Sequence, residues 1–252
     1  MRKHTAKQKY NIYNIYGING CSNIINQKKL NIIRIDIMIG GIADKKNWIR
    51  KIDRSIKHLI QKLQKNHFLK KYSGKRTQGI VISFTGDLIK KINIKKLVAK
   101  NECLLVIDNL EDPQNLGQII RTCECASISG LLLPEHQSVK LTDAVLQVSQ
   151  GAFIHLPIYS CGNLHQELSL LKKEGFWIIG VENSIQSKSW YELDYNRKLV
   201  IVMGGEGKGI RPIILKTCDE LLTIPMLGNI NSLNVSSATS AILFERQRQL
   251  SR

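Results

Sequence analysis

From Cys103 onward, short apolar runs alternate with segments of helical periodicity, and this alternation limits the folds open to the chain. Residues 103–108 and 199–203 are apolar at almost every position, as strands buried on both faces are. Between such runs, apolar residues recur with the spacing of one helix face. Strands that alternate with helices form parallel sheets covered by helices on both sides. Residues 102–252 are therefore predicted to be an α/β domain with a mostly parallel sheet.

The expected elements of this domain follow in chain order. Strands are expected at residues 103–108, 130–133, 154–159, 176–181, 199–203 and 221–224, and helices at 115–127, 141–150, 163–173, 211–217 and 235–249. In sheets of this kind, ligands bind beyond the carboxyl ends of the strands. The segments that directly follow strands are therefore the best candidates for a site.

The run at 199–203 ends in a glycine-rich segment, residues 203–209, with the sequence Met-Gly-Gly-Glu-Gly-Lys-Gly. Glycines leave the backbone N–H and C=O groups uncovered, so that a ligand can approach the main chain closely. Glu206 is the side chain in this segment suited to chemistry, and a solvated loop acid is the alternative interpretation. The segment is predicted to be a ligand-binding turn.

Two common nucleotide-binding motifs do not fit this turn. Gly-x-Gly-x-x-Gly fails because Ile210 stands at the third glycine counted from Gly205. The P-loop pattern Gly-x-x-x-x-Gly-Lys-Ser/Thr also fails. Val202 stands at the position of its first glycine, and Gly209 stands where the pattern requires the hydroxyl of Ser or Thr. Neither a dinucleotide nor a nucleoside triphosphate is indicated.

Two further segments follow expected strands. In residues 112–121, Asn115 is placed to cap a helix, and Arg121 lies off the apolar stripe of that helix, which predicts exposure. In residues 224–236, Ile-Pro-Met leads to a polar loop in which Ser232 and Asn234 are placed to cap the last helix. Capping alone, and a simple surface arginine, are the alternatives. Together the three segments predict a binding crevice at the strand ends.

The positive charge of the chain lies almost entirely in its first part. The formal net charge is +17, but residues 1–100 carry 24 Lys and Arg against 4 Asp and Glu, whereas residues 101–252 carry 13 against 16. The abundance of Lys, Asn and Ile is typical of a compositional bias that both parts share, so it does not explain the asymmetry. A polyanion is the expected partner of the first part.

The first part is expected to hold a basic disordered tail at residues 1–12, a small α/β RNA-binding domain at 13–84 and a linker at 85–101. A strand is expected at residues 32–38, a helix with one apolar and one basic face at 48–64, and a further strand at 79–84. Simple solvation is the alternative for the basic face. Residues 70–79 are expected to be a cationic loop, and its candidate RNA contacts are Lys70, Lys71, Lys75 and Arg76.

Cysteine usage and hydropathy indicate the cellular compartment in which the protein is expected. The 6 cysteines show neither Cys-x-x-Cys pairs nor the His spacing of a zinc site, so reduced core thiols, no disulfide and no metal are expected. No run approaches the roughly 18 apolar residues of a membrane helix. The cytoplasm is the expected location, with no membrane partner, although the basic amino terminus leaves a mitochondrial presequence open.

The three segments resemble, in order and register, the motifs of the SpoU (TrmH-like) RNA ribose 2'-O-methyltransferases of the SPOUT superfamily. The matching patterns are Asn-x-Gly-x-x-x-Arg, Gly-x-Glu-Gly-x-Gly and Ile-Pro-Met followed by Ser-Leu-Asn-Val-Ser. Residues 16–80 are more faintly similar to the amino-terminal RNA-binding domain of the subfamily that methylates a guanosine of 23S rRNA. This subfamily usually has a His-Ala-Val-like sequence where residues 19–21 are Asn-Gly-Cys, and often His where Thr77 stands.

The resemblance implies properties that spacing does not reveal: S-adenosylmethionine as methyl donor, a homodimer and a carboxy-terminal trefoil knot, although knots are almost absent among folds. It implies a catalytic constellation of Asn115, Arg121, Glu206, Ser232 and Asn234. The donor-binding positions that it implies are Gly204, Gly205, Gly207, Ile224, Met226 and Leu233. A tRNA ribose methyltransferase and a non-catalytic RNA-binding or ribosome-assembly factor remain as alternatives.

Overall fold

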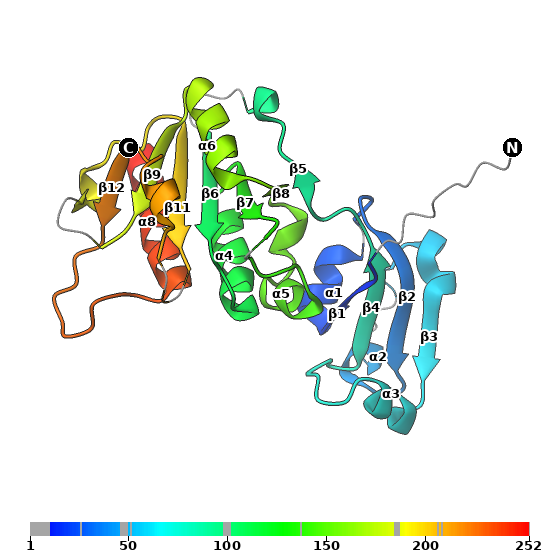
Figure 1. Ribbon diagram of the computed structural model, residues 1–252. Coiled ribbons are helices and arrows are strands. Elements are labelled where there is room, and N and C mark those ends of the chain that lie inside the picture. The colour runs from blue at the N-terminus through cyan, green and yellow to red at the C-terminus, as the bar shows by residue number, and fades with distance from the viewer. Residues whose placement is uncertain are drawn as a thin grey trace, which may run out of the picture. The chain divides into compact units, whose positions relative to one another are not determined.

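The structure is a computed structural model, and it describes residues 11–25, 27–45, 50, 52–97, 102–136, 138–183, 187–205, 207 and 209–251. The chain divides into two compact units, residues 1–87 and residues 88–252, called here the N-terminal and C-terminal units (Figure 1). Each unit is described separately. The expectation of a disordered tail falls mostly on residues 1–10, which lie outside the described residues.

The described residues of the N-terminal unit form a four-stranded sheet in the order β1-β4-β2-β3. The pairs β1–β4 and β4–β2 are antiparallel, whereas β2 and β3 are parallel. The strands are β1 (Tyr13–Tyr16), β2 (Asn31–Met38), β3 (Ile60–Leu63) and β4 (Ile80–Thr85), and the helices are α1 (Ile18–Ile24), α2 (Ile42–Lys45), α3 (Lys65–Lys71) and the 3-10 helix η2 (Arg54–Leu59). The expected strands at 32–38 and 79–84 are confirmed as β2 and β4.

The helix expected at residues 48–64 is wrong where the structure describes it. Residues 54–59 form η2, and Ile60–Leu63 is strand β3, which pairs with β2 from Ile35 to Met38. The apolar residues of this segment satisfy a helical spacing, but a parallel ladder with a distant strand satisfies the same backbone groups and buries Leu63. The first residues of the expected helix, 48, 49 and 51, lie outside the described residues.

The described residues of the C-terminal unit form an eight-stranded sheet, in the order β10-β12-β9-β11-β6-β7-β8-β5, and every pair is parallel. The expected parallel sheet is thus confirmed, while the trefoil knot stays a prediction. The strands are β5 (Lys90–Lys91), β6 (Cys103–Asp108), β7 (Gly130–Pro134), β8 (Ile158–Cys161), β9 (Trp177–Val181), β10 (Lys188–Ser189), β11 (Leu199–Gly204) and β12 (Glu220–Thr223).

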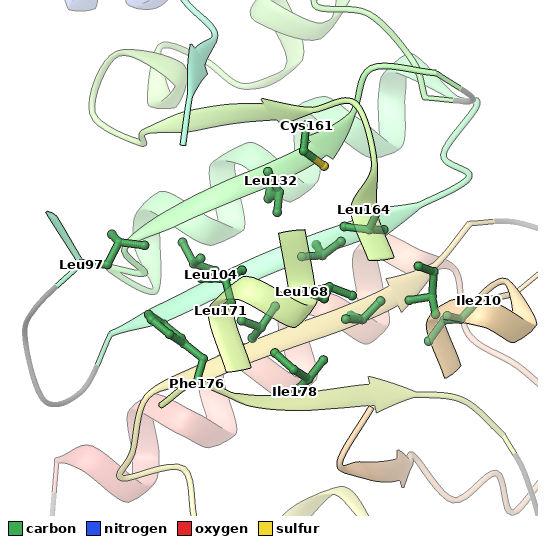
Figure 2. Close-up of a cluster of buried hydrophobic side chains, with 14 residues drawn as sticks. Leu97, Leu104, Leu132, Cys161, Leu164, Leu168, Leu171, Phe176, Ile178 and Ile210 are labelled. Carbon is green, nitrogen blue, oxygen red and sulfur yellow. The ribbon is translucent and has the colours of Figure 1, made fainter. Parts of the chain in front are cut away.

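Helices cover both faces of this sheet (Figure 1). The α-helices are α4 (Pro113–Cys125), α5 (Asp143–Val148), α6 (Leu164–Lys173), α7 (Pro212–Leu215) and α8 (Val235–Leu250), and the 3-10 helices are η3 (Ile94–Lys96), η4 (Ala152–Ile154) and η5 (Trp190–Glu192). Leu164, Leu168 and Leu171 of α6 pack on Leu104 and other residues of one sheet face, as Figure 2 shows. Because side chains alternate along a strand, the neighbouring strand residues face α4 and α8 on the other side.

Two expectations for the C-terminal unit need correction. The strand expected at 154–159 begins at Ile158, because Gly151 adopts a φ of 93° and residues 152–154 continue as η4. The linker expected at 85–101 contributes β5, which pairs with β8 at Tyr159 and Ser160 and so belongs to the sheet. Residues 98–101 of that linker lie outside the described residues.

All 6 cysteines are free, and their environments predict very different reactivities. Burial raises the pKa of Cys103 to about 11 and that of Cys161 to about 12. The thiolate is the reacting form, so a raised pKa slows reaction with thiol reagents at neutral pH. Cys125, at the end of α4, is exposed.

We therefore expect the native protein to release one fast equivalent of chromophore with a disulfide reagent such as DTNB, and the remaining thiols to react only on unfolding. Cys125→Ser should remove the fast phase. Cys161→Ser is the control, and it should leave the fast phase intact. A fast phase that survives in Cys125→Ser would contradict the burial described above.

Candidate active site

The three segments singled out in the sequence meet at one edge of the C-terminal sheet. Strands β6, β11, β9 and β12 are successive neighbours and run parallel, so their carboxyl ends share that edge. Strand β6 leads into residues 109–121, β11 into the glycine loop at 205–210, and β12 into residues 224–234. The sheet thus brings the segment after β6 together with two segments that lie far from it in sequence.

A cavity of about 660 Å³ opens at this edge. Its described lining comes from the end of β9, the glycine loop, the segment after β12 and the start of α8. The lining residues are Val181, Glu182, Asn183, Met203, Gly204, Gly205, Gly207, Gly209, Thr223, Ile224, Met226, Asn231, Ser232, Leu233, Asn234, Val235 and Ala238. The volume lies within the range of about 300–1,000 Å³ that is usual for small-molecule sites.

Glycine is required at the first positions of the loop because other backbone lies against them. A Cβ on Gly205 would lie 1.9 Å from the carbonyl oxygen of Asn109, and one on Gly204 would lie 2.4 Å from the carbonyl carbon of Gly209. The N–H of Gly205 donates to the carbonyl of Asp108 at 2.7 Å, and Gly205 forms an isolated bridge with Gly209. The close packing lets main chain, rather than side chains, form this part of the cavity wall.

An ion pair closes the loop from its other end. Asp108, the last residue of β6, is fully buried, and its carboxylate accepts the backbone N–H of Arg211 at 3.0 Å. The guanidinium of Arg211 adds bonds from Nε at 3.0 Å and Nη2 at 2.8 Å. Asp108 therefore fixes both ends of residues 205–211, by its carbonyl at Gly205 and by its carboxylate at Arg211. A charge-assisted, bidentate contact of this kind orders a loop strongly.

Asn234 and Asn115 are brought together from opposite ends of the unit. Asn234 caps α8, because its Oδ1 accepts the N–H of Ser236 at 2.9 Å. Its Nδ2 donates to Oδ1 of Asn115 at 3.0 Å, and Asn115 is only 3% exposed. The cap expected at Asn115 is wrong, since Asp112 caps α4 by accepting the N–H of Gln114. Asn115 instead lies in the first turn of α4 and holds the loop before α8.

A polar seam that was not predicted from the sequence continues this contact along α4 and α8. Ser236 Oγ lies 2.7 Å from Oε1 of Gln118, and Thr122 Oγ1 lies 3.1 Å from Ser240 Oγ. The hydroxyl and amide groups recur with helical spacing on both helices, which is the signal that would have revealed the seam. It fixes the position of α8, and with it the cavity wall at Val235 and Ala238.

The six expected donor-binding residues, at positions 204, 205, 207, 224, 226 and 233, all line the cavity. Of the expected catalytic residues, Ser232 and Asn234 line it, and Asn115 is bonded to Asn234. Arg121 is exposed on α4, as expected, and is not part of the described lining. Glu206 lies outside the described residues. The cap of α8 is Asn234, so the capping role considered for Ser232 is not observed.

Two polar lining residues, Glu182 and Asn183, were not singled out from the sequence. Glu182 accepts the N–H of Ile210 at 3.2 Å. Asn183 donates from Nδ2 to the carbonyl of Asn231 at 3.0 Å and accepts from Thr223 Oγ1 at 3.3 Å. Residues 182 and 183 directly follow an expected strand of the sheet, so their place in sequence was the available signal. Together they tie the end of β9 to the segment after β12.

The cationic segment of the N-terminal unit is a helix end and a turn rather than a single loop. Lys70 and Lys71 belong to the last turn of α3. Lys71 is paired with the buried Asp36 at 2.7 Å, and the hydroxyl of Tyr72 also donates to Asp36. Lys71 therefore anchors the end of α3 to β2, and its charge is partly neutralised.

The turn after α3 is attached to the start of α1. The N–H of Gly17 donates to the carbonyl of Thr77 at 3.1 Å, and the N–H of Ile18 donates to Oε1 of Gln78 at 2.8 Å. Lys75 Nζ lies 5.6 Å from the ring centre of Tyr16. Lys75 and the neighbouring Arg76 are exposed, so this turn presents two cations next to an aromatic ring.

Known proteins with similar sequences are RNA methyltransferases. The sequence profile of the SpoU rRNA Methylase family matches residues 102–244. A 23S rRNA (guanosine-2'-O-)-methyltransferase RlmB of Shewanella oneidensis is 37% identical over 175 residues, which are 68% of this chain and 71% of that protein. A Staphylococcus saprophyticus protein assigned to the TrmH family of tRNA/rRNA methyltransferases is 34% identical over 203 residues, 79% of this chain and 81% of that one.

Solved structures share the fold. The SpoU methyltransferase AviRb of Streptomyces viridochromogenes, in complex with the cofactor AdoMet, superposes with a TM-score of 0.79 over 95% of this chain and 91% of that chain, at 16% identity. The A. aeolicus TrmH/SpoU tRNA modifying enzyme is 32% identical, with a TM-score of 0.55 over 63% of this chain and 82% of that chain.

Two features are absent from the residues that the structure describes. These residues contain no group of three or more His, Cys, Asp or Glu side chains placed to hold a metal ion. In the same part of the chain, no helix is long and apolar enough to cross a membrane.

The profile match covers more than half of the chain, including all three segments at the strand ends. This chain belongs to the SpoU family of RNA methyltransferases.

Proposed function

We propose that the protein transfers a methyl group from S-adenosylmethionine to a ribose 2'-hydroxyl of RNA. The observation that carries this proposal is the cavity, whose walls are the glycine loop and the segment after β12, with the Asn115–Asn234 pair beside it. These are the segments whose order and register match the family motifs. The RlmB relative, named for guanosine 2'-O-methylation, and AviRb, solved in complex with AdoMet, support the same chemistry.

The residues present fit the donor. At Gly204 and Gly205 the cavity wall is main chain, because neighbouring backbone leaves no room for a side chain there, so an adenosine group would meet backbone at these positions. Apolar lining from Ile224, Met226 and Leu233 suits a nucleoside base. When bound, the donor supplies a sulfonium methyl, an electrophile that needs no metal.

The protein must then place and deprotonate a weakly nucleophilic hydroxyl. The exposed Arg121 is proposed to hold the target ribose and a neighbouring phosphate, because guanidinium binds phosphate in a fixed geometry. We assign it an orienting role, since arginine keeps its proton at neutral pH. Ser232, Asn234 and Asn115 are proposed to shape the approach to the donor, and Glu206 to hold Arg121 or Asn115. Alignment of the reacting atoms supplies much of the rate in such transfers.

The proposed substrate is a guanosine of 23S rRNA. The RlmB relative acts on that RNA, and the excess of positive charge in residues 1–100 suits a large polyanion. A tRNA substrate is the second candidate, because the S. saprophyticus relative carries both substrates in its name. A non-catalytic assembly factor is disfavoured by the Asn115–Asn234 pair, which a pure RNA binder does not need.

We also propose a homodimer in the cytoplasm. Phe244 on α8 is 50% exposed in the single chain, and such exposed aromatic surface is typical of an interface. Light scattering at several concentrations tests the dimer. A mass of one chain at every concentration would refute it.

The substrate is tested by incubating the purified protein with labelled S-adenosylmethionine and, separately, with unmodified 23S rRNA and tRNA transcripts. Nuclease digestion and mass spectrometry then locate the label. Label in a 23S guanosine supports the proposed substrate. Label in tRNA alone would keep the chemistry and replace the substrate, whereas RNA binding without any label would favour the assembly factor.

The turn at Lys75 and Arg76 is proposed to bind RNA phosphates, which gives a separate prediction. Lys75→Ala/Arg76→Ala should weaken RNA binding and lower the slope of log K against log salt by about 0.7 for each phosphate that the variant no longer neutralises. Filter binding at several salt concentrations measures both quantities. Lys28→Ala/Lys29→Ala is the matched control, since it removes two exposed lysines from the same unit. Equal effects of the two double variants would show that the turn has no special role.

A further inference from the structure

Glu182 lies at the end of β9 with its carboxylate against the glycine loop. Its Oε2 accepts the backbone N–H of Ile210 at 3.2 Å. A Cβ built on Gly209 would lie 2.9 Å from Oε2 and 3.3 Å from Oε1, so both carboxylate oxygens pack on this glycine. Because Gly209 and Glu182 both line the cavity, the carboxylate forms part of the cavity wall.

Glu182 gives the described part of the cavity its charge. Among the lining residues that the structure describes, it is the sole acidic or basic side chain, and the others are apolar, amide, hydroxyl or glycine. Among the residues that the structure describes, no Lys or Arg forms an ion pair with Glu182. It is also half-buried, and charges withdrawn from solvent are less screened by salt. The described part of the cavity wall therefore presents a negative charge to a bound ligand.

The donor and the product of methyl transfer differ in charge. S-adenosylmethionine has an ammonium, a carboxylate and a sulfonium, with a net charge of about +1 at neutral pH. When the methyl group moves to the ribose oxygen, the C–S electron pair stays on sulfur and the hydroxyl proton leaves to solvent. S-adenosylhomocysteine therefore keeps the ammonium and carboxylate but has a neutral sulfur. The two molecules otherwise have almost the same shape.

We propose that the Glu182 carboxylate makes the cavity selective for the cationic donor over the neutral product. The proposal rests on the donor assigned above. Attraction between unit charges weakens slowly with distance, so Glu182 acts on the sulfonium from the cavity wall without contacting it. Loss of that attraction after transfer favours release of the product and its exchange for a new donor.

Glu182→Gln tests this selectivity, because glutamine removes the charge and keeps an oxygen that accepts the Ile210 N–H. Calorimetric titration would use S-adenosylmethionine, S-adenosylhomocysteine and sinefungin, in which an ammonium replaces the sulfonium methyl. We expect the variant to bind the two cationic ligands about fivefold more weakly and the neutral product with unchanged affinity. High salt should reduce the difference in the wild type and have little effect on it in the variant. Glu174→Gln, which neutralises an exposed acid after α6, is the matched control and should bind all three ligands like the wild type.

Each other outcome has a definite meaning. Equal weakening for all three ligands would assign Glu182 to loop structure or to a hydroxyl contact, and no change for any ligand would remove it from recognition; both overturn the proposal. Unchanged binding of the product also shows that the variant is folded. A wild-type protein that binds none of the ligands would refute the proposed donor itself, which separates that failure from this one.

Discussion

Gly205→Ala is expected to lower the affinity for S-adenosylmethionine by about 100-fold, which corresponds to about 2.8 kcal/mol. The added Cβ would lie 1.9 Å from the carbonyl oxygen of Asn109, well inside van der Waals contact. That oxygen belongs to backbone directly after β6, so the glycine loop has to move instead. Displacing the loop also disturbs the Gly205 N–H bond to Asp108. Calorimetric titration of the donor measures the loss.

Gly228→Ala is the matched control for this variant. Gly228 lies in the segment after β12, and a Cβ there would meet no atom within 4 Å. We expect it to bind the donor like the wild type. Thermal unfolding of both variants separates a local change of the loop from loss of the fold. Wild-type affinity in a folded Gly205→Ala protein would show that the glycine loop does not form the donor site.

Arg121→Ala is expected to lower kcat by about 10²- to 10³-fold while donor affinity stays unchanged, because Arg121 lies outside the described cavity lining. Arg121→Lys should retain part of the activity, since a lysine still attracts phosphate but does not reproduce the planar fork of donors. Single-turnover methyl transfer, with donor titration alongside, measures the two effects separately.

Arg197→Ala provides the control for loss of an arginine. Arg197 precedes β11, at the opposite edge of the sheet. Its ion pair with Asp194 is exposed, so the pair contributes little to stability. It should leave kcat unchanged. Complete inactivity of Arg121→Lys, with donor and RNA binding intact, would contradict an orienting role and favour proton transfer by Arg121.

The sheet of the C-terminal unit was predictable because its strands are buried on both faces. Residues 103–108 and 199–203 are runs of apolar side chains that no exposed element would carry, and β6 and β11 follow them almost residue for residue. The edge strand β5 of the same sheet was not predictable. Lys90–Lys91 is an edge strand of two residues whose only signal is its pairing with β8, and its own sequence resembles a solvated loop.

The helix expected at residues 48–64 shows the limit of local patterns. Its apolar spacing fits a helix, but the segment that ends at Leu63 gains more by pairing with β2. The choice depends on a contact with a strand more than twenty residues away, which periodicity cannot report. The same limit applies to the turn after α3, where hydrogen bonds to Gly17 and Ile18 fix residues 77 and 78.

The candidate site, like the fold, was predicted only in part. The glycine loop and the segment after β12 were found because their residue types are unusual at strand ends, and all six expected donor-binding positions line the cavity. The Asn115–Asn234 bond joins residues 119 positions apart, so it was found only as part of a family pattern, and Asn115 was misread as a cap. Glu182 was missed because a single acid after a strand is a common feature of sequences.

The central claim is that the methyl group reaches a ribose oxygen of RNA, and alkaline hydrolysis of labelled RNA tests it most directly. A methylated 2'-oxygen cannot attack the adjacent phosphate, so the bond that follows it resists alkali. After reaction with methyl-labelled S-adenosylmethionine, we predict that the label appears in an alkali-resistant dinucleotide and that Arg121→Ala removes most of it. Label in mononucleotides would place the methyl group on a base and contradict the account.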